Sequence, residues 1–591
     1  MSEETSKYSV STIAEMTGGI ILAHYDKNNR VDASSYQSEA ELERELIANL
    51  VSQGFKRENF KTSNELYTNL KVQIERLNDV SFSKSEWERF LTEYLDSPNE
   101  GMVEKTRKIQ EDYIYDFTFD DGHLKNIKII DKNNIHNNFL QVVNQVIGGD
   151  RNQNRYDVTI LVNGLPLIHI ELKKRGVPLQ EAFNQIHRYS KESFNLDHSL
   201  YKFVQIFAIS NGTYSRYFAN TTAQNKNNYE FTCEWADAKN KVIRDLVDFT
   251  KTFFEKRVIL EVLTKYCVFD SSNTLLIMRP YQIAATERIL WKIKSSYEAK
   301  KAGTAEAGGF IWHTTGSGKT MTSFKSAQLI ADSGDADKVF FIMDRIELGI
   351  QSLNEYRNFA GGALTEQQRK KTVRGTEDTG ELRKALTDKN YDGKLIVTSI
   401  QKMDILCKDK QLTEYELEYL KTQRIVFIID ECHRSTFGDM LSNIKDAFPY
   451  ALFFGFTGTP IQLENEKKNS TTATLFGNEL HRYSIADGIR DGNVLGFHPY
   501  KVSTFKEKDL RENVCLMKVK ANSIEEMRSD PEKSKMYDEL FSSLPMCSIE
   551  DTGGNKIRGI EDEIPASQYN SDKHRRAVVG DILDNWDNVT N

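Results

Sequence analysis

Residues 312–320 read Trp-His-Thr-Thr-Gly-Ser-Gly-Lys-Thr, and residues 430–433 read Asp-Glu-Cys-His. Together these two stretches have the composition of a nucleoside-triphosphate site. The glycines of the first stretch allow a tight bend in which backbone N–H groups hold phosphate oxygens, and Lys319 can reach the β- and γ-phosphates. Thr320 begins the next helix, where its hydroxyl can bind Mg²⁺. The residues expected to hold the nucleotide are Thr315, Gly316, Ser317, Gly318, Lys319 and Thr320.

The setting of both stretches favours this site over its alternatives, an ordinary flexible turn and an acidic pair that caps a strand. A short apolar segment precedes the glycine-rich loop, although His313 stands where the loop pattern usually begins with glycine. Another apolar segment, residues 425–429, ends at Asp430. Asp430 can therefore bind Mg²⁺, and Glu431 can orient an attacking water molecule. We expect ATP and Mg²⁺ as cofactors.

The composition of the 591 residues is that of an ordinary globular protein, with 39% hydrophobic and 28% charged residues. At roughly 150 residues per domain, the length suggests about four domains. Apolar runs are too short to cross a bilayer, and the polar first residues argue against a signal peptide. Six cysteines without a Cys-x-x-Cys pair indicate reduced thiols. We therefore expect a cytoplasmic protein with no membrane partner.

The charge balance limits how the protein can bind nucleic acid. Its formal net charge is −8, whereas nucleic-acid-binding domains usually carry a basic patch. Contact with DNA must therefore come from a local basic cluster, such as Lys173-Lys174-Arg175, or from partner subunits. Lys174 is the candidate DNA contact in this cluster.

Other segments around the loop follow the plan of a motor domain. Apolar strands alternate with helical stretches, which predicts a parallel sheet with helices on both faces. Polar motifs follow the strands at their carboxyl ends, where such sheets bind ligands. Gln282, in an Arg-Pro-Tyr-Gln string at a helix start, can hydrogen-bond an adenine edge or can simply cap that helix.

A third motif, Thr-Gly-Thr-Pro, stands at 457–460. The glycine-rich loop, the Asp-Glu-Cys-His motif and this third motif occur in the order found in the first RecA-like domain of superfamily 2 helicases and translocases. The chain resembles that domain over about residues 265–465. The resemblance implies that Thr398 contacts the DNA backbone. It also implies that Thr457 and Thr459 couple the nucleotide state to the grip on DNA. Capping of strand ends is the alternative role for these threonines.

The strongest hairpin signal of the chain is Asn163-Gly164 between two alternating apolar segments. A strict two-residue turn with uninterrupted pairing would set Val158 opposite His169 and mix core with polar side chains. A three-residue loop or a bulge instead sets Val158 opposite Ile170, so that the apolar side chains share one face. The hydrophobic pattern therefore predicts the shifted register.

The shifted register brings Asp157 opposite Glu171, with Lys173 on the same face. Cross-strand neighbours lie about 5 Å apart, which is close enough for two carboxylates to share a divalent metal. Bound Mg²⁺ would polarise a phosphodiester and acidify a water molecule, which Lys173 can position. This arrangement resembles the PD-(D/E)xK nuclease family. Tyr156 stands before Asp157, where the family pattern has a proline but tolerates other residues. The alternative to a catalytic role is that Glu171 and Lys173 are ordinary solvated charges at the end of a strand.

Two helices add weaker signals of the same kind. Gln185 and Tyr189, one helical turn apart, resemble the Gln-x-x-x-Tyr element of RecB-like nucleases, which implies a catalytic role for both. A capping box at 38–41 opens a helix that carries Glu43 or Glu45, where related nucleases keep an acidic residue. For Glu43, an ordinary position on the helix surface is the preferred interpretation.

A nuclease followed by a superfamily 2 motor is the order found in the restriction subunit of type I restriction–modification enzymes, which nearly the whole chain resembles. The expected fold is α/β, with a PD-(D/E)xK endonuclease domain at 1–262, a RecA-like domain at 263–465, and a linker with an incomplete second RecA-like domain at 466–591. The resemblance implies ATP-dependent translocation of double-stranded DNA and Mg²⁺-dependent cleavage away from the recognition site. It also implies separate methyltransferase and specificity subunits as partners.

No Gln-x-x-Gly-Arg-type string of a second motor domain follows residue 500. We therefore expect a truncated or cleaved chain that binds ATP but does not translocate DNA alone. Two other functions remain open. One is a freestanding helicase-nuclease of DNA repair, which would need no methyltransferase, and the other is a non-catalytic scaffold fragment in which both sites are relics.

Overall fold

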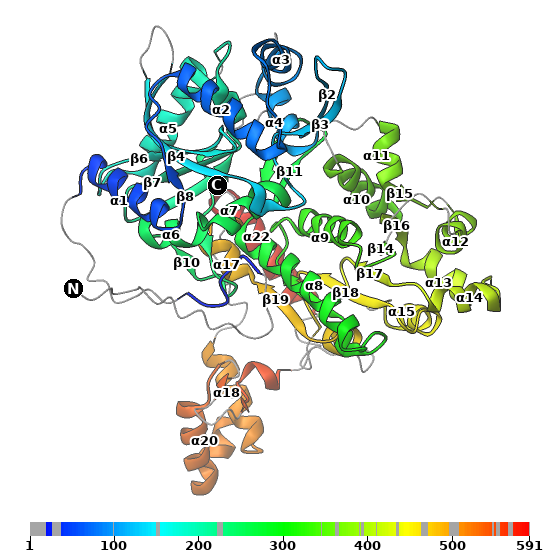
Figure 1. Ribbon diagram of the computed structural model, residues 1–591. Coiled ribbons are helices and arrows are strands. Elements are labelled where there is room, and N and C mark those ends of the chain that lie inside the picture. The colour runs from blue at the N-terminus through cyan, green and yellow to red at the C-terminus, as the bar shows by residue number, and fades with distance from the viewer. Residues whose placement is uncertain are drawn as a thin grey trace. The chain divides into compact units, whose positions relative to one another are not determined.

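The computed structural model describes residues 19–25, 37–97, 100–148, 154–194, 196–220, 228–343, 346–360, 366–376, 378–388, 391, 395–408, 411–432, 437–461, 471–495, 507–546, 549–550, 556–564 and 571–589. The chain forms two compact units, residues 1–495 and residues 496–591. The first unit contains two large sheets, one in its N-terminal part and one in the part that follows (Figure 1).

The N-terminal sheet is mixed and has six strands in the order β1-β4-β5-β6-β7-β8. Strands β4, β5 and β6 are antiparallel neighbours, whereas β6 and β7 run parallel. Every residue of β6 is buried, as expected for a central strand that is covered on both faces. The strands are β1 (Lys56–Arg57), β4 (Leu140–Gly148), β5 (Asn154–Val162), β6 (Leu165–Leu172), β7 (Ile206–Ser210) and β8 (Ser215–Ala219).

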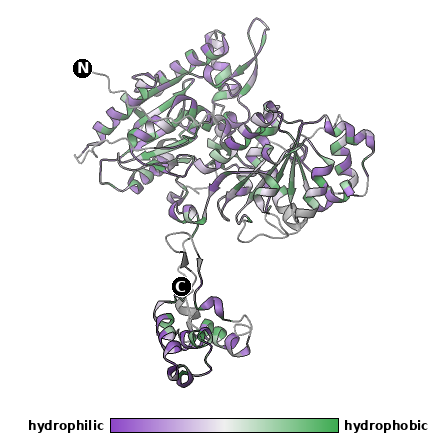
Figure 2. Ribbon diagram, turned by 90° about the horizontal axis from the view of Figure 1, so that it is seen from below, coloured by the Kyte–Doolittle hydropathy of each residue, from purple (hydrophilic) through white to green (hydrophobic). Residues whose placement is uncertain are grey.

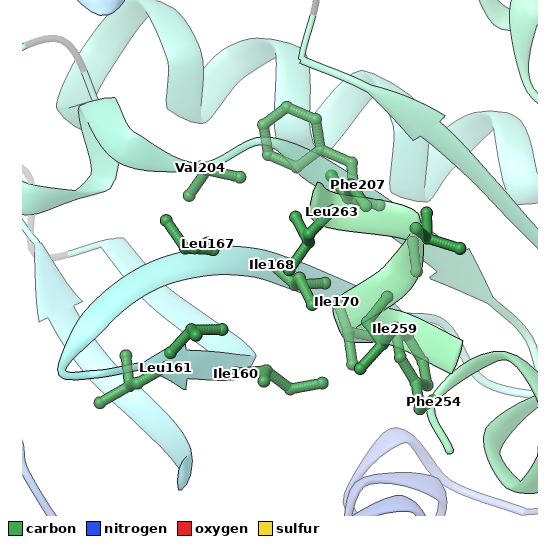
Figure 3. Close-up of a cluster of buried hydrophobic side chains, with 14 of the residues drawn as sticks. Ile160, Leu161, Leu167, Ile168, Ile170, Val204, Phe207, Phe254, Ile259 and Leu263 are labelled. Atoms are coloured by element: carbon green, nitrogen blue, oxygen red, sulfur yellow. The ribbon is translucent and has the colours of Figure 1, made fainter. Parts of the chain in front are cut away.

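Buried apolar side chains hold this sheet against its helices. Ile160, Ile168 and Ile170 lie beside Ile259 and Leu263 of helix α7 in the core (Figure 3). Each such side chain contributes about 1.5–3 kcal/mol when it is removed from water. The helices are α1 (Glu39–Ser52), α2 (Ser63–Asn78), α3 (Lys84–Phe90), α4 (Met102–Gln110), α5 (Leu179–Tyr189), α6 (Leu246–Phe253) and α7 (Lys256–Lys265). Short antiparallel pairs join β2 (Ile114–Thr118) to β3 (Leu124–Lys128), β9 (Trp235–Ala236) to β10 (Val242–Ile243), and β11 (Cys267–Phe269) to β12 (Leu275–Ile277).

The register of β5 and β6 is the one that the hydrophobic pattern predicts. Val158 pairs with Ile170, and the register shifts by one residue after Ile160. Asn163 and Gly164 form the turn with φ values of +51° and +84°, which is the left-handed backbone of a type I′ hairpin turn. The turn itself therefore has two residues, and a β-bulge takes up the extra one.

The second sheet is parallel throughout and has seven strands in the order β15-β16-β14-β17-β18-β13-β19. Its central strands are hydrophobic (Figure 2), because helices cover both faces. Helices α8, α9 and α10 pack on one face, and α12 to α15 pack on the other. The strands are β13 (Gly309–His313), β14 (Lys338–Met343), β15 (Val373–Gly375), β16 (Leu395–Ser399), β17 (Ile425–Ile429), β18 (Leu452–Thr457) and β19 (Glu479–Tyr483).

Ten helices follow one another along the described residues of this part. They are α8 (Pro280–Glu298), α9 (Lys319–Ser333), α10 (Ile346–Phe359), α11 (Glu366–Thr372), α12 (Thr379–Thr387), α13 (Ile400–Lys408), α14 (Glu414–Lys421), α15 (Phe437–Ala447), α16 (Thr472–Phe476) and α17 (Ile485–Arg490).

Two elements cross the domain boundaries expected from the sequence. Helix α7 spans the boundary placed between residues 262 and 263. Strand β19 pairs in parallel with β13, so this sheet continues past residue 465, and the first compact unit ends at Leu495. In β19, Glu479 and Arg482 are exposed whereas His481 and Tyr483 are buried, and the strand lacks the continuous apolar run that marks the central strands in the sequence.

The second unit is mainly helical where the structure describes it. Its helices are α18 (Glu507–Lys518), α19 (Ile524–Ser529), α20 (Pro531–Ser543) and α22 (Asp572–Val589), and β20 (Ile549–Glu550) pairs with β21 (Lys556–Ile557). A small core around Cys515, Met527 and Tyr537 joins α18, α19 and α20. No parallel sheet occurs among these described elements, so the second RecA-like domain stays a prediction.

Two general features of the described part of the chain concern cysteines and membranes. Its five cysteines, Cys233, Cys267, Cys407, Cys432 and Cys515, form no disulfide with one another. Within the same residues, no helix combines the length and the apolar character that crossing a bilayer would need.

We expect Gly164→Ala to lower the midpoint of thermal unfolding more than Gly176→Ala does. Both glycines have left-handed backbones, with φ of +84° and +87°, so alanine costs about 1–2 kcal/mol at each. A Cβ at position 164 would also lie 2.7 Å from the Leu70 Cα atom, whereas nothing lies within 4 Å of a Cβ at position 176. The overpacking at position 164 should add about 1–3 kcal/mol. Calorimetry of the two variants measures the difference, and equal midpoints would contradict the described hairpin.

Candidate active sites

The glycine-rich loop lies between a strand and a helix, as predicted. Gly316 and Gly318 have φ of +81° and +79°, a region that glycine enters at little cost. Lys319 is the first residue of α9, and the half-buried Thr320 follows it in the first helical turn. The loop thus delivers both side chains to a helix N-terminus, where backbone N–H groups favour an anion such as a phosphate.

Helix α8 holds this loop through two side chains. Tyr281 Oη donates to the Ser317 carbonyl oxygen at 2.7 Å, and Gln282 Nε2 donates to the same oxygen at 3.2 Å. A Cβ on Gly318 would lie 2.7 Å from Gln282 Nε2, so a larger residue there would displace this amide group from the loop. Ser317 is buried, whereas Thr315 remains exposed.

Both polar atoms of the Gln282 side chain are already engaged within the protein. This side chain is 1% exposed, and its Oε1 accepts from the Arg279 backbone N–H at 2.9 Å, which caps the start of α8. The amide nitrogen serves the loop at the same time. The contact with adenine expected from the sequence therefore stays a prediction.

Asp430 and Glu431 follow the buried strand β17 and lie beside the loop lysine. Lys319 Nζ lies 3.9 Å from Glu431 Oε1, so the sheet brings the two motifs together. Glu431 has φ of +50°, and its backbone N–H donates to Asp430 Oδ1 at 2.9 Å. Burial and the Glu431 carboxylate raise the pKa of Asp430 to about 6, so a divalent cation would stabilise its charged form. His433 lies outside the described residues.

The threonines assigned to DNA contact and coupling are buried or bonded within the sheet edge. Thr398 is 2% exposed, and its hydroxyl accepts from the Thr376 hydroxyl at 2.9 Å. Thr457 Oγ1 accepts from the Thr459 backbone N–H at 3.1 Å. These bonds fit the alternative role of capping strand ends. A contact between Thr398 and DNA would require its hydroxyl to become exposed, and it stays a prediction.

The second cluster forms where β5 and β6 run side by side. Glu171 is fully buried on β6, and Lys173 Nζ lies 3.4 Å from Glu171 Oε1 and 3.8 Å from Glu39 Oε1. Asp157 Oδ2 accepts from the Leu172 backbone N–H at 2.9 Å, which holds the Asp157 carboxyl group against the end of β6. The structure therefore brings Asp157, Glu171 and Lys173 together.

The two carboxyl groups of this cluster resist ionisation. Burial raises the pKa of Asp157 to about 7, and the Glu171 carboxylate adds to that rise. Burial raises the pKa of Glu171 to about 8, against the attraction of the Lys173 ammonium group. Adjacent oxygen donors of this kind suit a divalent cation, which would offset their repulsion. The described residues contain no group of three or more His, Cys, Asp and Glu side chains that could hold a metal ion, so water or substrate oxygens would complete the coordination.

Helix α5 places Gln185 and Tyr189 against the same strands. Gln185 Nε2 donates to Tyr189 Oη, and Tyr189 Oη donates to the Arg155 carbonyl oxygen on β5 at 3.0 Å. Burial and the nearby Glu171 carboxylate raise the pKa of Tyr189. The Gln-x-x-x-Tyr element thus borders the carboxyl pair. Lys174 is exposed just beyond β6.

Glu43 is more than the ordinary helix-surface residue that the sequence favours. Its carboxylate accepts from Asn144 Nδ2 and, at 2.8 Å, from Gln145 Nε2. Gln145 has φ of +54° and falls on β4 at the position opposite Asp157, between regular pairs on either side. The irregular backbone of β4 could not be read from the sequence, whereas the capping box of Ser38 is present and did locate the helix.

His169 is a second residue that the sequence interpretation left unused. It is fully buried, and its Nε2 lies 3.3 Å from Glu171 Oε2. A signal was available, because His169 precedes Glu171 by two residues on one strand and therefore shares its face.

The fold and the two clusters define a nuclease-like domain joined to a motor ATPase. A family model described as the type I restriction enzyme R protein N terminus matches residues 36–226, and one described as the SWI2/SNF2 ATPase matches residues 281–534. The type I restriction enzyme EcoprrI endonuclease subunit of Escherichia coli is 56% identical over 292 residues, or 49% of this chain and 92% of that protein. The chain therefore belongs to the family of type I restriction enzyme endonuclease subunits.

Longer relatives extend well beyond the matched region. The type I restriction enzyme SauMSSORF170P endonuclease subunit of Staphylococcus aureus (strain MSSA476) is 38% identical over 484 residues, which are 81% of this chain and 48% of that protein. The chain thus spans about half the length of such relatives. A solved structure of a nuclease-deletion mutant of the type ISP restriction-modification enzyme LlaGI with a DNA substrate mimic is 16% identical, with a TM-score of 0.26 over 51% of this chain and 29% of that one.

In metal-free buffer, we expect the contribution of Asp157 and Glu171 to the stability of the native chain to fall as the pH rises from about 4 to 8. The folded pKa values of Asp157 and Glu171, about 7 and 8, lie above the unfolded values of roughly 3.9 and 4.3. The folded chain therefore binds more protons in this window, and raising the pH favours unfolding.

Glu171→Gln removes one of these carboxyl groups and should flatten that dependence. Its thermal midpoint, relative to that of the native chain, should rise by several degrees between pH 5 and pH 8.5 in EDTA. Glu181→Gln, at an exposed position on α5, is the matched control and should show no such trend. A constant offset between Glu171→Gln and the native chain at all pH values would contradict the raised pKa of Glu171.

Proposed function

We propose that this protein acts as the restriction subunit of a type I restriction–modification enzyme. In this role, ATP-dependent translocation of double-stranded DNA is coupled to Mg²⁺-dependent cleavage away from the recognition site. The observation that carries the proposal is that one compact unit, residues 1–495, holds both side-chain clusters. A nuclease or a motor alone would need only one of them.

The nuclease residues divide the work of phosphodiester hydrolysis. Mg²⁺, when bound, would polarise the phosphate and acidify a water molecule. Asp157 and Glu171 would hold the ion with their carboxylates. Lys173 carries its positive charge 3.4 Å from Glu171, where it can orient the water and stabilise the negative charge that develops on the phosphate. Tyr189, which accepts a hydrogen bond from Gln185, braces α5 against β5 through its own bond to the Arg155 carbonyl oxygen.

The motor residues hold and hydrolyse the nucleotide. ATP would bind to the backbone N–H groups of the glycine-rich loop, and its bound Mg²⁺ would offset phosphate charge. Lys319 would contact the β- and γ-phosphates, while Thr320 and Asp430 would bind the ion. Glu431, 3.9 Å from the Lys319 ammonium group, would orient the attacking water molecule.

Partner subunits would supply recognition of the DNA sequence and its methylation. The net charge of −8 supports this division, because a chain that bound DNA alone would usually carry a larger basic surface. Lys174 is a local cation that could contact the DNA backbone near the nuclease residues. We therefore assign methyltransferase and specificity subunits as partners.

The test is cleavage of unmethylated plasmid DNA by the complex reconstituted with its methyltransferase and specificity subunits. Lys173→Ala should reduce cleavage about 100-fold or more, since one stabilising charge is lost, and should leave DNA-stimulated ATP hydrolysis intact. Lys319→Ala should abolish both activities, although Asp157, Glu171 and Lys173 are unchanged. Gel electrophoresis and a phosphate-release assay measure the two activities in the same samples.

The outcomes separate the proposal from its alternatives. Normal cleavage by Lys319→Ala would mean that the nuclease is independent of the motor, as in a freestanding repair nuclease. Absence of both activities in the native complex would favour a scaffold. Lys301→Ala, in an exposed pair with Glu306, is the control for a lysine outside both clusters and should behave as native.

A further inference from the structure

His169 lies behind the nuclease carboxyl pair in a setting that fixes its ring. It is 0% exposed, and its cross-strand partner on β5 is Thr159. Five aromatic rings surround the imidazole, with centroids 5.5–6.4 Å away: Tyr156, Tyr189, Phe194, Tyr201 and Phe207. These rings exclude water and leave the imidazole little freedom to rotate.

Both ring nitrogens of His169 face polar atoms inside this cage. Nε2 lies 3.3 Å from Glu171 Oε2, and Nδ1 lies 3.4 Å from Thr159 Oγ1. Thr159 Oγ1 in turn lies 3.1 Å from the Tyr201 hydroxyl. A neutral imidazole has one donor and one acceptor nitrogen. If Tyr201 donates to Thr159 and Thr159 donates to Nδ1, the ring proton sits on Nε2 and points at the carboxylate.

The other oxygen of Glu171 is engaged from the opposite side. Lys173 Nζ lies 3.4 Å from Oε1, whereas His169 reaches Oε2. Each oxygen therefore faces a separate nitrogen atom, and rotation of the carboxyl group would disrupt both contacts. A carboxylate held in this way keeps one orientation relative to Asp157, which lies beside it across the two strands.

We propose that His169 is a positioning residue of the nuclease site: it donates its Nε2 proton to Glu171 and, with Thr159 setting its tautomer, orients that carboxylate for the divalent metal. The proposal rests on the proposed nuclease function of Asp157, Glu171 and Lys173. It assigns no step of proton transfer to His169, and the histidine touches neither substrate nor metal.

A purely structural role is the alternative. The ring fills an aromatic cage, and the Val158 carbonyl also faces it, so His169 could serve packing and that carbonyl alone. The two roles differ in one respect. A packing residue affects cleavage only through stability, whereas a positioning residue changes the concentration of Mg²⁺ that the site needs.

Two amide substitutions separate these roles. The amide nitrogen of glutamine can occupy the place of the histidine Nε2, whereas that of asparagine can reach only the place of Nδ1. In the reconstituted complex, His169→Gln should keep cleavage within about threefold of native. His169→Asn and His169→Leu should lose about 10–100-fold in cleavage or in affinity for Mg²⁺, the range found when partners behind metal ligands are removed.

The measurements are cleavage rates over a Mg²⁺ titration, ATP hydrolysis and thermal midpoints for each variant. ATP hydrolysis should stay native in all three, because the motor does not use His169. His187→Leu, on helix α5, is the control for a nearby histidine and should show the native Mg²⁺ dependence. Thr159→Val, which removes the hydroxyl group, should shift the Mg²⁺ dependence in the same direction as His169→Asn. Thr159→Ser, which keeps that group, should show the native Mg²⁺ dependence.

Three results would overturn the proposal. These are native Mg²⁺ dependence in His169→Asn and His169→Leu, equal losses in all three His169 variants, or losses that follow the thermal midpoints alone. If the native complex does not cleave DNA, the proposed function itself fails. Calorimetric titration of the full chain with Mg²⁺ then still decides the role of His169, because His169→Asn should bind the ion more weakly than His169→Gln, and equal binding would refute the positioning role.

Discussion

The cluster of Asp157, Glu171 and Lys173, here called the nuclease cluster after its proposed role, depends on one constraint: apolar side chains of β5 and β6 must share a buried face. A hairpin paired without interruption from its two-residue turn would direct Val158 and His169 to the same side. The bulge after Ile160 moves the pairing by one residue and restores Val158 to Ile170. The same shift lays Asp157 beside the end of β6, where the Leu172 N–H binds its carboxyl group. The burial of apolar side chains, which take no part in the chemistry, thus sets the positions of Asp157 and Glu171.

A comparable dependence joins the motor helices to the phosphate loop. Gln282 approaches Gly318 so closely that a Cβ would stand 2.7 Å from its amide nitrogen. Tyr281, on the same helix, donates to the Ser317 carbonyl oxygen. The Tyr281 ring also stacks on the ring of Tyr483 at the end of β19, with the centroids 3.6 Å apart. The loop is therefore tied to α8 and, through the stacked rings, to the edge strand. A change in the loop on nucleotide binding would act on both elements.

Much of this arrangement follows from the sequence, for identifiable physical reasons. Continuous apolar runs predict the central strands of the parallel sheet, and the Asn163-Gly164 turn with its alternating flanks predicts the register at the nuclease cluster. Strand β19 could not be predicted in this way, because it is an edge strand with exposed charged residues and no continuous apolar run. The left-handed backbone of Gln145 and its bond to Glu43 also escape it, since they arise from tertiary contacts between α1 and β4. Gln282 shows a further limit: the sequence suggested adenine binding or helix capping for its side chain, whereas its contact with the Ser317 carbonyl oxygen arises from tertiary structure.

The backbone of Glu431 has a consequence for which residues the position can accept. Its φ of +50° is a conformation that costs a side-chain-bearing residue about 1–3 kcal/mol and that glycine or asparagine would tolerate better. Either replacement would relax the chain, but neither carries a carboxylate beside Lys319. With the role proposed for Glu431 in orienting the attacking water, stability and ATP hydrolysis would place opposite demands on this residue. A variant that no longer hydrolyses ATP could accept glycine or asparagine at this position and gain stability.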